Sequence, residues 1–287
     1  MSLEAQLFGI SRQGLYKRKK AALVARATES DTIKIVRKIR KYLPRLGGKK
    51  LHYVLHKYFN AVHSPLGRDR LFKTLREAQL LVPRRKRYFI TTNSKHQFYK
   101  HPNRTFDLEL TMPEQLWVSD ITYIRTADKH LYLSLVTDAY SRKIVGYHLA
   151  DHLKATGPVE ALKMALRSRM YPGNQLTHHS DRGIQYCSEQ YVGLLHQNGI
   201  MVSMTTCYDP YENAKAERVN GILKNEFEWD APFPDFKYAN REITKAIRIY
   251  NNMRPHLSNH YLTPEEAHQK FNPNPIKLDN LWHSIYQ

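Results

Sequence analysis

Three acidic residues stand out because their spacing and surroundings suit one kind of chemistry. Asp120 lies in WVSDITYI, Asp181 in HHSDRGIQY and Glu217 in NAKAERVNGILKNE, with 60 residues between the first two and 35 between the last two. The first lies in an apolar, β-branched run typical of a strand, the second just past a short run, as at a strand end, and the third in a helical pattern. Carboxylates from separate elements are what a two-metal phosphoryl-transfer site needs, because Mg²⁺ prefers oxygen ligands and a metal pair stabilises both the attacking and the leaving oxygen.

A second aspartate, Asp138 in LVTDAYSRK, competes with Asp120 for the first position. An aspartate in the centre of a strand is locally unfavourable, and such conflicts tend to mark functional sites. Asp138 lies near the end of its run, where a role in the turn is the simpler explanation, so we favour Asp120. His178 and His179 lie close to Asp181 and could act as ligands or general bases, but structural hydrogen bonding explains them better.

The helical pattern around Glu217 places this acid on a polar face, just beside the apolar stripe. Asn213, Asn220, Gly221 and Lys224 share that side, at i−4, i+3, i+4 and i+7. A glycine inside a helix costs about 1 kcal/mol relative to alanine. A DNA backbone lying against the helix would explain this glycine, and close helix packing would explain it equally well. Lys224 could hold a phosphate near the metals.

The segments that carry these acids are predicted to form a sheet flanked by helices. QLWVSDITYIR, LYLSLVTDAY and KIVGYHLA are strand-like runs separated by short turns, which predicts an antiparallel meander. The segments that follow are a helix beginning at Gly157-Pro158, a short strand over 174–180, a helix capped by Ser188, the strand IMVSMTT and a helix beginning at Asp209-Pro210. The order β-β-β-α-β-α-β-α is that of a mixed sheet flanked by helices, as in the ribonuclease H-like fold.

Basic charge is concentrated in the first third of the chain. The net charge is +19; residues 1–100 hold 25 Lys and Arg against 5 Asp and Glu, and the remaining 187 residues hold 20 against 21. A segregated basic excess is typical of a module that binds a polyanion, and nucleic acid is the best candidate. The hydrophobic content of 41% excludes a disordered chain, and the two cysteines fit no metal-ligand spacing and favour a reducing, cytosolic setting. No apolar run is long enough to span a membrane.

The flanking segments look helical. Residues 4–20 predict a truncated helix-turn-helix in which Ser11 caps the second helix, and residues 32–82 predict three helices, the first capped by Asp31 or Thr32. Thr263-Pro264 predicts the start of a C-terminal helix. The expected domains are a partial helix-turn-helix or basic arm (1–30), a helical DNA-binding domain (31–83), a basic linker (84–111), the catalytic core (112–236) and a helical C-terminal extension (237–287).

Taken together, WVSDITYI, HHSDRGIQY, PYENAKAERVNGILKNE and YNNMRPH resemble the integrase core of bacterial insertion-sequence transposases, in particular the second-frame product of the insertion-sequence three family. The resemblance covers most of the chain. It implies an α/β, ribonuclease H-like core preceded by an all-helical helix-turn-helix region. It also implies that Asp120, Asp181 and Glu217 form a metal-binding catalytic triad and that Lys224 holds the DNA end. The chain departs from its relatives at Gly221, where retroviral integrases carry a second basic residue.

We therefore expect a DNA transposase that cleaves and joins strands with two Mg²⁺ ions, for which Mn²⁺ can substitute. The expected partners are double-stranded DNA, as terminal inverted repeats and as target, other copies of the chain and a fused upstream frame product, with no membrane; the expected location is the bacterial cytoplasm, at the nucleoid when bound. The residues expected to contact DNA are Lys224, Lys215, Arg218, Asn213, Arg68, Arg70, Arg84, Arg85, Lys86 and Arg87. Two alternatives are a ribonuclease H-like nuclease that does not join strands and a non-catalytic DNA-binding regulator.

Overall fold

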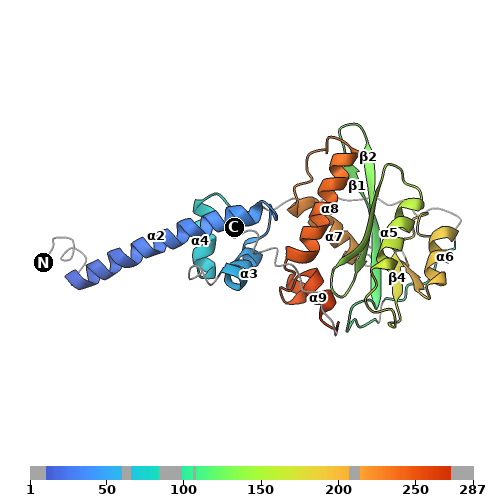
Figure 1. Ribbon diagram of the computed structural model, residues 1–287, viewed down its shortest axis with the longest axis horizontal. Helices are drawn as coiled ribbons and strands as arrows, with labels where there is room; N and C mark the ends of the chain where they lie inside the picture. Colours follow the sequence, from blue (N-terminus) through green and yellow to red (C-terminus); the bar gives the residue numbers. More distant parts are fainter. Residues whose placement is uncertain (1–10, 60–65, 84–98, 106–107, 207–213, 273–287) are drawn as a thin grey trace. The chain divides into compact units, whose positions relative to one another are not determined.

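The computed structural model describes residues 11–59, 66–83, 99–105, 108–206 and 214–272 (Figure 1). These residues fall into two compact units, one over 11–83 and the other over 99–272. Within the described ranges no helix is long and apolar enough to cross a membrane.

The second unit is built on a five-stranded sheet with strand order β3-β2-β1-β4-β5. The strands are β1 (Leu116–Arg125), β2 (His130–Asp138), β3 (Ile144–Ala150), β4 (Thr177–Ser180) and β5 (Met201–Met204). The first three strands form the expected antiparallel meander, and β4 and β5 then add in parallel. The predicted mixed sheet is therefore confirmed, and the short strand expected over 174–180 begins at Thr177.

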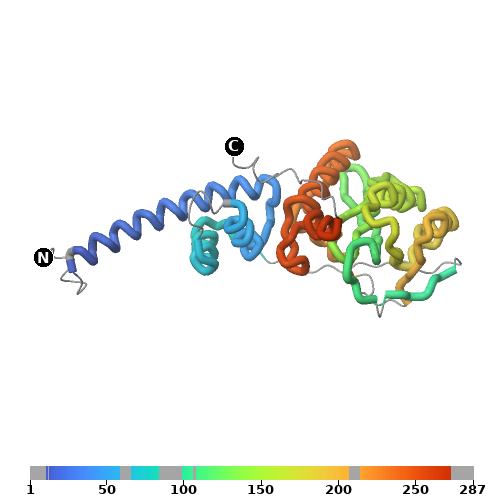
Figure 2. The backbone as a smooth tube through the Cα atoms, turned by 60° about the horizontal axis from the view of Figure 1, so that its bottom comes forward, coloured from blue at the N-terminus to red at the C-terminus, as the bar shows by residue number. Residues whose placement is uncertain are grey.

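Helices cover both faces of this sheet, as Figure 1 and Figure 2 show. The helices of this unit are α5 (Thr156–Arg167), α6 (Glu189–Gln197), α7 (Ala214–Glu226), α8 (Phe236–Met253), the 3₁₀ turn η1 (Leu257–Asn259) and α9 (Pro264–Gln269). One hydrophobic core packs α5 and α6 around Trp117, and the other packs α7 and α8 around Leu133. Burial on both faces explains why the strands read as nearly continuous apolar runs.

One glycine sets how closely α5 approaches the sheet. A Cβ atom at Gly146 of β3 would lie 2.1 Å from the carbonyl oxygen of Ala161 and 2.9 Å from the Cβ of Ala165, both on α5. Only a residue without a side chain fits there, so the sheet and α5 are in backbone contact at this point.

The helix starts follow the expected capping residues. Ser188 accepts a hydrogen bond from the backbone N–H of Tyr191 at the start of α6. Thr263 and Glu266 form a complete capping box at the start of α9, with Pro264 in the first turn. These two starts were readable from sequence because the cap lies within three residues of its partner. The expected helix start at Asp209-Pro210 lies outside the described residues.

The first unit contains α2 (Arg12–Arg40), α3 (Gly48–Phe59) and α4 (Arg68–Glu77), which are helical as expected. The third helix was expected to reach Val82, but α4 ends at Glu77, and Gln79 has a left-handed backbone conformation. Ser11 caps α2, accepting from the N–H of Gly14 at 3.0 Å. The expected helix start at Asp31 or Thr32 is wrong, because α2 continues through both residues. No glycine or proline lies between Gly14 and Pro44 to end the helix. The Thr32 hydroxyl instead donates back to the Thr28 carbonyl. Residues 1–10 of the expected helix-turn-helix lie outside the described residues.

Part of the segment expected as a linker belongs to the second unit. The N–H of Arg104 donates to the Ser203 hydroxyl at 2.9 Å, and the N–H of Met204 donates to the Pro102 carbonyl at 3.4 Å. Residues 102–104 therefore run beside β5. The domain boundaries given above stay predictions.

Candidate active site

The strand register brings the first two acids together. Trp117 of β1 pairs in parallel with His178 of β4, an offset of 61 residues, and the same offset separates Asp120 from Asp181. Neighbouring strands lie about 4.8 Å apart, so continuing this register past the end of β4 sets the two aspartates beside each other. Asp120 is half-buried in the middle of β1, and Asp181 follows β4 directly and accepts from the N–H of Gly183 at 3.0 Å.

Glu217 reaches the same place from α7. Ala216 packs with Leu116 and Val118 of β1 in a small apolar cluster, which holds the first turn of α7 against the start of that strand. Side chains alternate along a strand, so Asp120 leaves the sheet on the same face as Val118, toward α7. Glu217, in the first turn of α7, is exposed beside it.

The pKa values of Asp120 and Glu217 are both raised, by burial and in part by the charge of Asp181. Burial raises the pKa of Asp120 to about 7, with the charges of Asp181 and Glu217 adding to this effect. Burial and the charge of Asp181 also raise the pKa of Glu217. Like charges held together in this way favour a bound cation, which would relieve their repulsion. Among the described residues no three acidic, histidine or cysteine side chains already form a metal-ligand cluster.

Asn220 is a contact of this site whose role sequence reasoning did not identify. Its side-chain Nδ2 donates to Asp120 Oδ2 at 2.7 Å, and the backbone N–H of Ile121 donates to Oδ1 at 2.9 Å. Asn220 is only 5% exposed and follows Glu217 by one turn of α7. It therefore ties the helix that carries Glu217 to the strand that carries Asp120. In the sequence, Asn220 could be placed on the same polar helix face as Glu217. That its side chain contacts Asp120 depends on how α7 packs against β1, which the sequence does not show.

Asn220→Ala is expected to weaken metal binding more than folding. The substitution removes a hydrogen bond that favours the charged form of Asp120 and fixes its orientation, and residues that orient metal ligands typically contribute about 10–100-fold in affinity or activity. We would measure the Mg²⁺ concentration that gives half-maximal strand cleavage, with Asn225→Ala on the exposed side of α7 as the control. An unchanged Mg²⁺ requirement would show that Asn220 has a structural role alone.

A buried ion pair fixes the far end of α7. Arg254, from the YNNMRPH motif just past α8, donates from Nε and Nη2 to the two carboxylate oxygens of Glu226 at 2.7 and 2.6 Å. Such a two-point contact fixes geometry as well as distance. It holds α7 against the end of α8, and thereby helps to set the position of Glu217.

The residues expected to contact DNA fall into separate groups. Lys224 is half-buried on α7; burial lowers its pKa, and the charge of Asp120 opposes this, so the ammonium lies near the acids. Lys215 and Arg218 are exposed on the same helix. Arg68 and Arg70 are on α4 of the first unit, where they pair with Asp69 and Glu29. Asn213, Arg84, Arg85, Lys86 and Arg87 lie outside the described residues.

The rival residues have structural roles. Asp138 is fully buried and accepts from the N–H and hydroxyl of Ser141, as expected of a turn aspartate. The Nε2 atom of His178 lies 2.7 Å from the Ser119 hydroxyl and 2.8 Å from the Tyr191 hydroxyl. Burial lowers the pKa of His178 to about 3, so its ring is neutral. His179 contacts the hydroxyl of Ser203 at 2.9 Å, which completes the expected structural hydrogen bonding.

The sequence and the fold both match known proteins. Two family models described as integrase core domain match residues 111–210 and 198–264. The chain is 33% identical over 277 residues to the insertion element IS600 uncharacterized 31 kDa protein of Shigella sonnei, covering 93% of this chain and 97% of that protein. It is 34% identical over 182 residues to the transposase for insertion sequence element IS904 of Lactococcus lactis, covering 63% of this chain and 71% of that protein.

A solved structure of similar fold is the simian T-cell lymphotropic virus intasome in complex with a PP2A regulatory subunit. The match has a TM-score of 0.50 and 18% identity, and it covers 80% of this chain and 77% of that one. At this identity the likeness shows the fold alone, which is that of an integrase core with its mixed sheet and flanking helices.

Proposed function

The chain belongs to the insertion-sequence three family of DDE transposases, and from this membership we propose that Asp120, Asp181 and Glu217 are its catalytic acids. As a member of that family it is a DNA transposase, an enzyme that transfers DNA strands. The observation that supports the three acids is the register of β1 and β4, which sets Asp120 beside Asp181. The raised pKa values of Asp120 and Glu217 agree with it.

The donor set fits a hard divalent cation. The family normally uses a divalent metal, and three neighbouring carboxylates, of which Asp181 raises the pKa of both others, supply the oxygen ligands and negative charge that Mg²⁺ or Mn²⁺ requires. We propose that Asp120, Asp181 and Glu217 hold two Mg²⁺ ions. When bound, such a pair supplies activation of the attacking hydroxyl and stabilisation of the leaving oxygen.

The chain's own residues would orient the reactants. Asn220 donates to the Asp120 carboxylate, and the Arg254–Glu226 ion pair holds the end of α7, so both contacts would help to keep Glu217 in position beside Asp120. Lys224, close to the acids, would bind a phosphate of the DNA end beside the scissile bond. Cutting and joining would use the same acids, with water and then a DNA 3′-hydroxyl as nucleophile.

The decisive experiment is incubation with a labelled duplex that carries the element's own end, with and without Mg²⁺. A transposase yields both cut ends and longer joined products. The nuclease alternative predicts cut products only, and the regulator alternative predicts binding without either product. The reading frame's position between short inverted repeats would identify the duplex to use.

Lys224→Ala is expected to reduce end-specific cleavage more than general DNA affinity. A hydrogen bond to a charged group contributes about 1.5–3 kcal/mol, which corresponds to roughly 10–100-fold. We would compare cleavage of the end duplex with binding to an unrelated duplex, using Arg167→Ala at an exposed position of α5 as the control. Equal losses of cleavage and binding would reduce Lys224 to an ordinary phosphate contact.

Gly221→Ala separates the two explanations offered for this glycine. A Cβ atom there would meet nothing nearer than Asn225 Nδ2 at 4.0 Å among the described residues, so close helix packing does not account for it. The variant should therefore gain about 1 kcal/mol of stability from helix propensity. We expect slower strand cleavage despite this gain, because the added methyl would meet the approaching DNA backbone. Undiminished cleavage would mean that DNA does not approach α7 at this point.

The remaining partners follow from the reaction. Transposition joins two element ends to a target, so we propose that the chain assembles as a homo-oligomer on terminal inverted repeats. We also propose that it acts in the bacterial cytoplasm, at the nucleoid when bound, and that an upstream frame product can be fused to it in the active form.

A further inference from the structure

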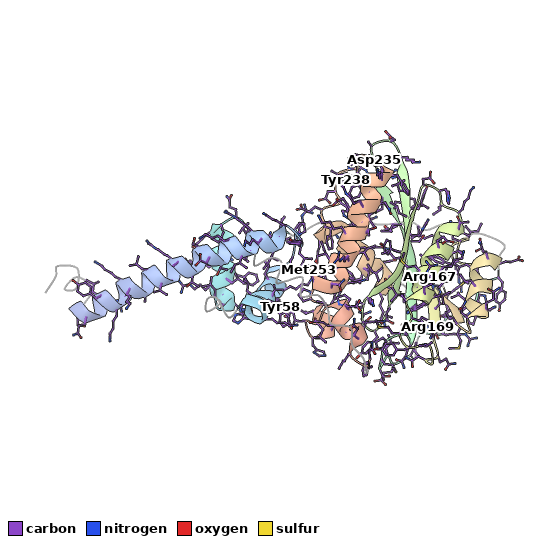
Figure 3. The ribbon with its side chains drawn as sticks, in the orientation of Figure 1. Tyr58, Arg167, Arg169, Asp235, Tyr238 and Met253 are labelled. Carbon is purple, nitrogen blue, oxygen red and sulfur yellow. The ribbon has the colours of Figure 1, made fainter. Side chains whose placement is uncertain are left out.

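The outer face of α8 carries a row of four exposed cations: Lys237, Arg241, Lys245 and Arg248. Their intervals of four, four and three residues keep them on one side of a helix with 3.6 residues per turn, over a length of about 16 Å. The opposite side is the apolar stripe that joins the core, including Ala239, Ile243 and Ile247. We call these four residues the α8 row. Figure 3 labels Tyr238 and Met253, which mark the two ends of this helix.

The α8 row is poorly neutralised by the protein. Glu242 is the one carboxylate of α8, and it pairs with Arg241 at 3.1 Å. No described residue forms an ion pair with Lys237, Lys245 or Arg248. Like charges at i and i+4 destabilise a helix by about 0.2–0.5 kcal/mol per pair. A local cost with no compensating contact among the described residues indicates a partner outside the protein.

We propose that the α8 row is a second DNA-contact surface, along which a phosphodiester backbone lies. Phosphates follow one another every 3.4 Å along the axis of one duplex strand, so about 16 Å of helix spans about five of them. The inference rests on the proposed function, in which the chain acts on DNA, but it assigns a surface that the catalytic acids do not include. The net charge of −1 over residues 101–287 conceals this local concentration of positive charge.

A second copy of the chain is a poorer occupant of this face. A two-fold contact sets the same patch of each copy against the other, so the α8 row would face an identical row of cations. The guanidinium of Arg241 also lies 4.7 Å from the ring centre of the exposed Tyr238, which orients it at the surface without neutralising it. A polyanion matches this face, whereas another cationic helix does not.

The test compares two full-length variants that each lose four positive charges. The first changes the row: Lys237→Gln, Arg241→Gln, Lys245→Gln and Arg248→Gln. The second is the matched control and changes exposed cations of other elements: Arg125→Gln, Lys129→Gln, Lys154→Gln and Arg167→Gln. Figure 3 places Arg167 on α5, across the sheet from α8. Binding of a mixed-sequence duplex is measured over a range of salt concentrations.

The row variant is expected to lose roughly three to four units from the slope of log K against log salt, because each phosphate contact contributes about 0.9. The control should lose less than about one unit. Glutamine suits helices and removes the repulsion along the row, so the unfolding midpoint of the row variant should be equal to or above that of the wild type. Weakened binding could then not be attributed to misfolding.

Three results would overturn the proposal. Equal slope losses in both variants would show a general charge effect, and an unchanged slope in the row variant would show that the row does not contact DNA. A changed sedimentation behaviour without a changed slope would assign the row to a protein interface.

The Asp120→Asn variant distinguishes a failure of the catalytic assignment from a failure of the α8 row. It should bind duplex DNA with the wild-type slope. Strand joining by that variant would refute the catalytic assignment while leaving the proposal for the α8 row intact.

Discussion

Asp120→Asn is expected to abolish strand cleavage and joining while making the metal-free protein more stable. The pKa of this carboxyl rises from 3.8 to about 7 on folding, because burial and then the charge of Asp181 disfavour the ionised form. A carboxyl whose folded pKa lies above its unfolded value opposes folding above the unfolded value, and the full penalty applies once the pH exceeds the folded value. Asparagine has no such penalty, so near pH 8 the free energy of unfolding should rise by a few kcal/mol, on the order set by 1.4 kcal/mol per pKa unit.

The same substitution should slow the reaction by about 10³-fold or more, because an amide cannot supply the charge that binds and stabilises a divalent cation, which contributes several kcal/mol in the transition state. Glu217→Gln should behave alike, and Asp128→Asn, at an exposed acid in the β1–β2 turn, is the control. Two measurements decide the matter: joined products from the end duplex in Mg²⁺, and denaturant unfolding in the presence of a chelator. Strand joining at the wild-type rate by either variant would refute the assignment of the three acids.

The sequence was informative where the signal is local. Asp120 is preferred over Asp138 because an acid in a strand centre conflicts with its surroundings. The structure places Asp120 on the face toward α7 and buries Asp138, and the assignment itself stays a prediction. The α6 and α9 starts at Ser188 and Thr263 are determined by contacts three residues away. The order of strands and helices follows from a change of hydrophobic period that is visible along the chain.

The sequence was uninformative where a contact depends on packing. The hydrogen bond from Asn220 to Asp120 requires the rotation of α7 over β1, which no local pattern records. The continuous helix α2 was misread because Asp31 and Thr32 are good capping residues, although they can also lie within a helix when nothing interrupts it. The α8 row is visible in the sequence, but its exposure is known only once the buried side of α8 has been established.

A second buried charge cluster, far from α7 in the sequence, should contribute strongly to the stability of the second unit. Glu114, Asp138 and His268 are all fully buried. Atom Nδ1 of His268 lies 3.8 Å from Asp138 Oδ1, and Nε2 lies 3.5 Å from Glu114 Oε1, so one imidazole lies between two carboxylates. His268 belongs to α9, and the cluster thereby attaches this helix to the turn after β2.

His268→Gln is expected to lower the free energy of unfolding by about 1.5–3 kcal/mol near pH 6, because it removes the imidazolium between the two carboxylates. Arg169 still pairs with Glu114, and Ser141 still donates to Asp138, so neither charge is left without a partner. His260→Gln, an exposed histidine in the turn before α9, is the control. Urea unfolding of both variants and the wild type measures the difference. A loss below about 1 kcal/mol would mean that the cluster contributes no more than an ordinary exposed ion pair.

The same cluster gives the unit a pH dependence whose sign can be worked out. Burial alone would lower the pKa of His268, but its contacts with Asp138 and Glu114 outweigh burial and raise it above 6.5. Burial would likewise raise the pKa values of Asp138 and Glu114, yet hydrogen bonds lower them below 3.8 and 4.5. The contribution of His268 to the free energy of unfolding is complete below pH 6.5 and is lost as the pH rises through its folded pKa. The contribution of Asp138 and Glu114 is complete above pH 4.5 and is lost as the pH falls through their folded pKa values. Stability from this cluster should therefore be greatest between pH 4.5 and 6.5. In an Asp120→Asn background, which removes the decline caused by the raised pKa of Asp120, His268→Gln should remove the remaining decline on the alkaline side. The same alkaline decline in the variant would show that another group titrates on unfolding.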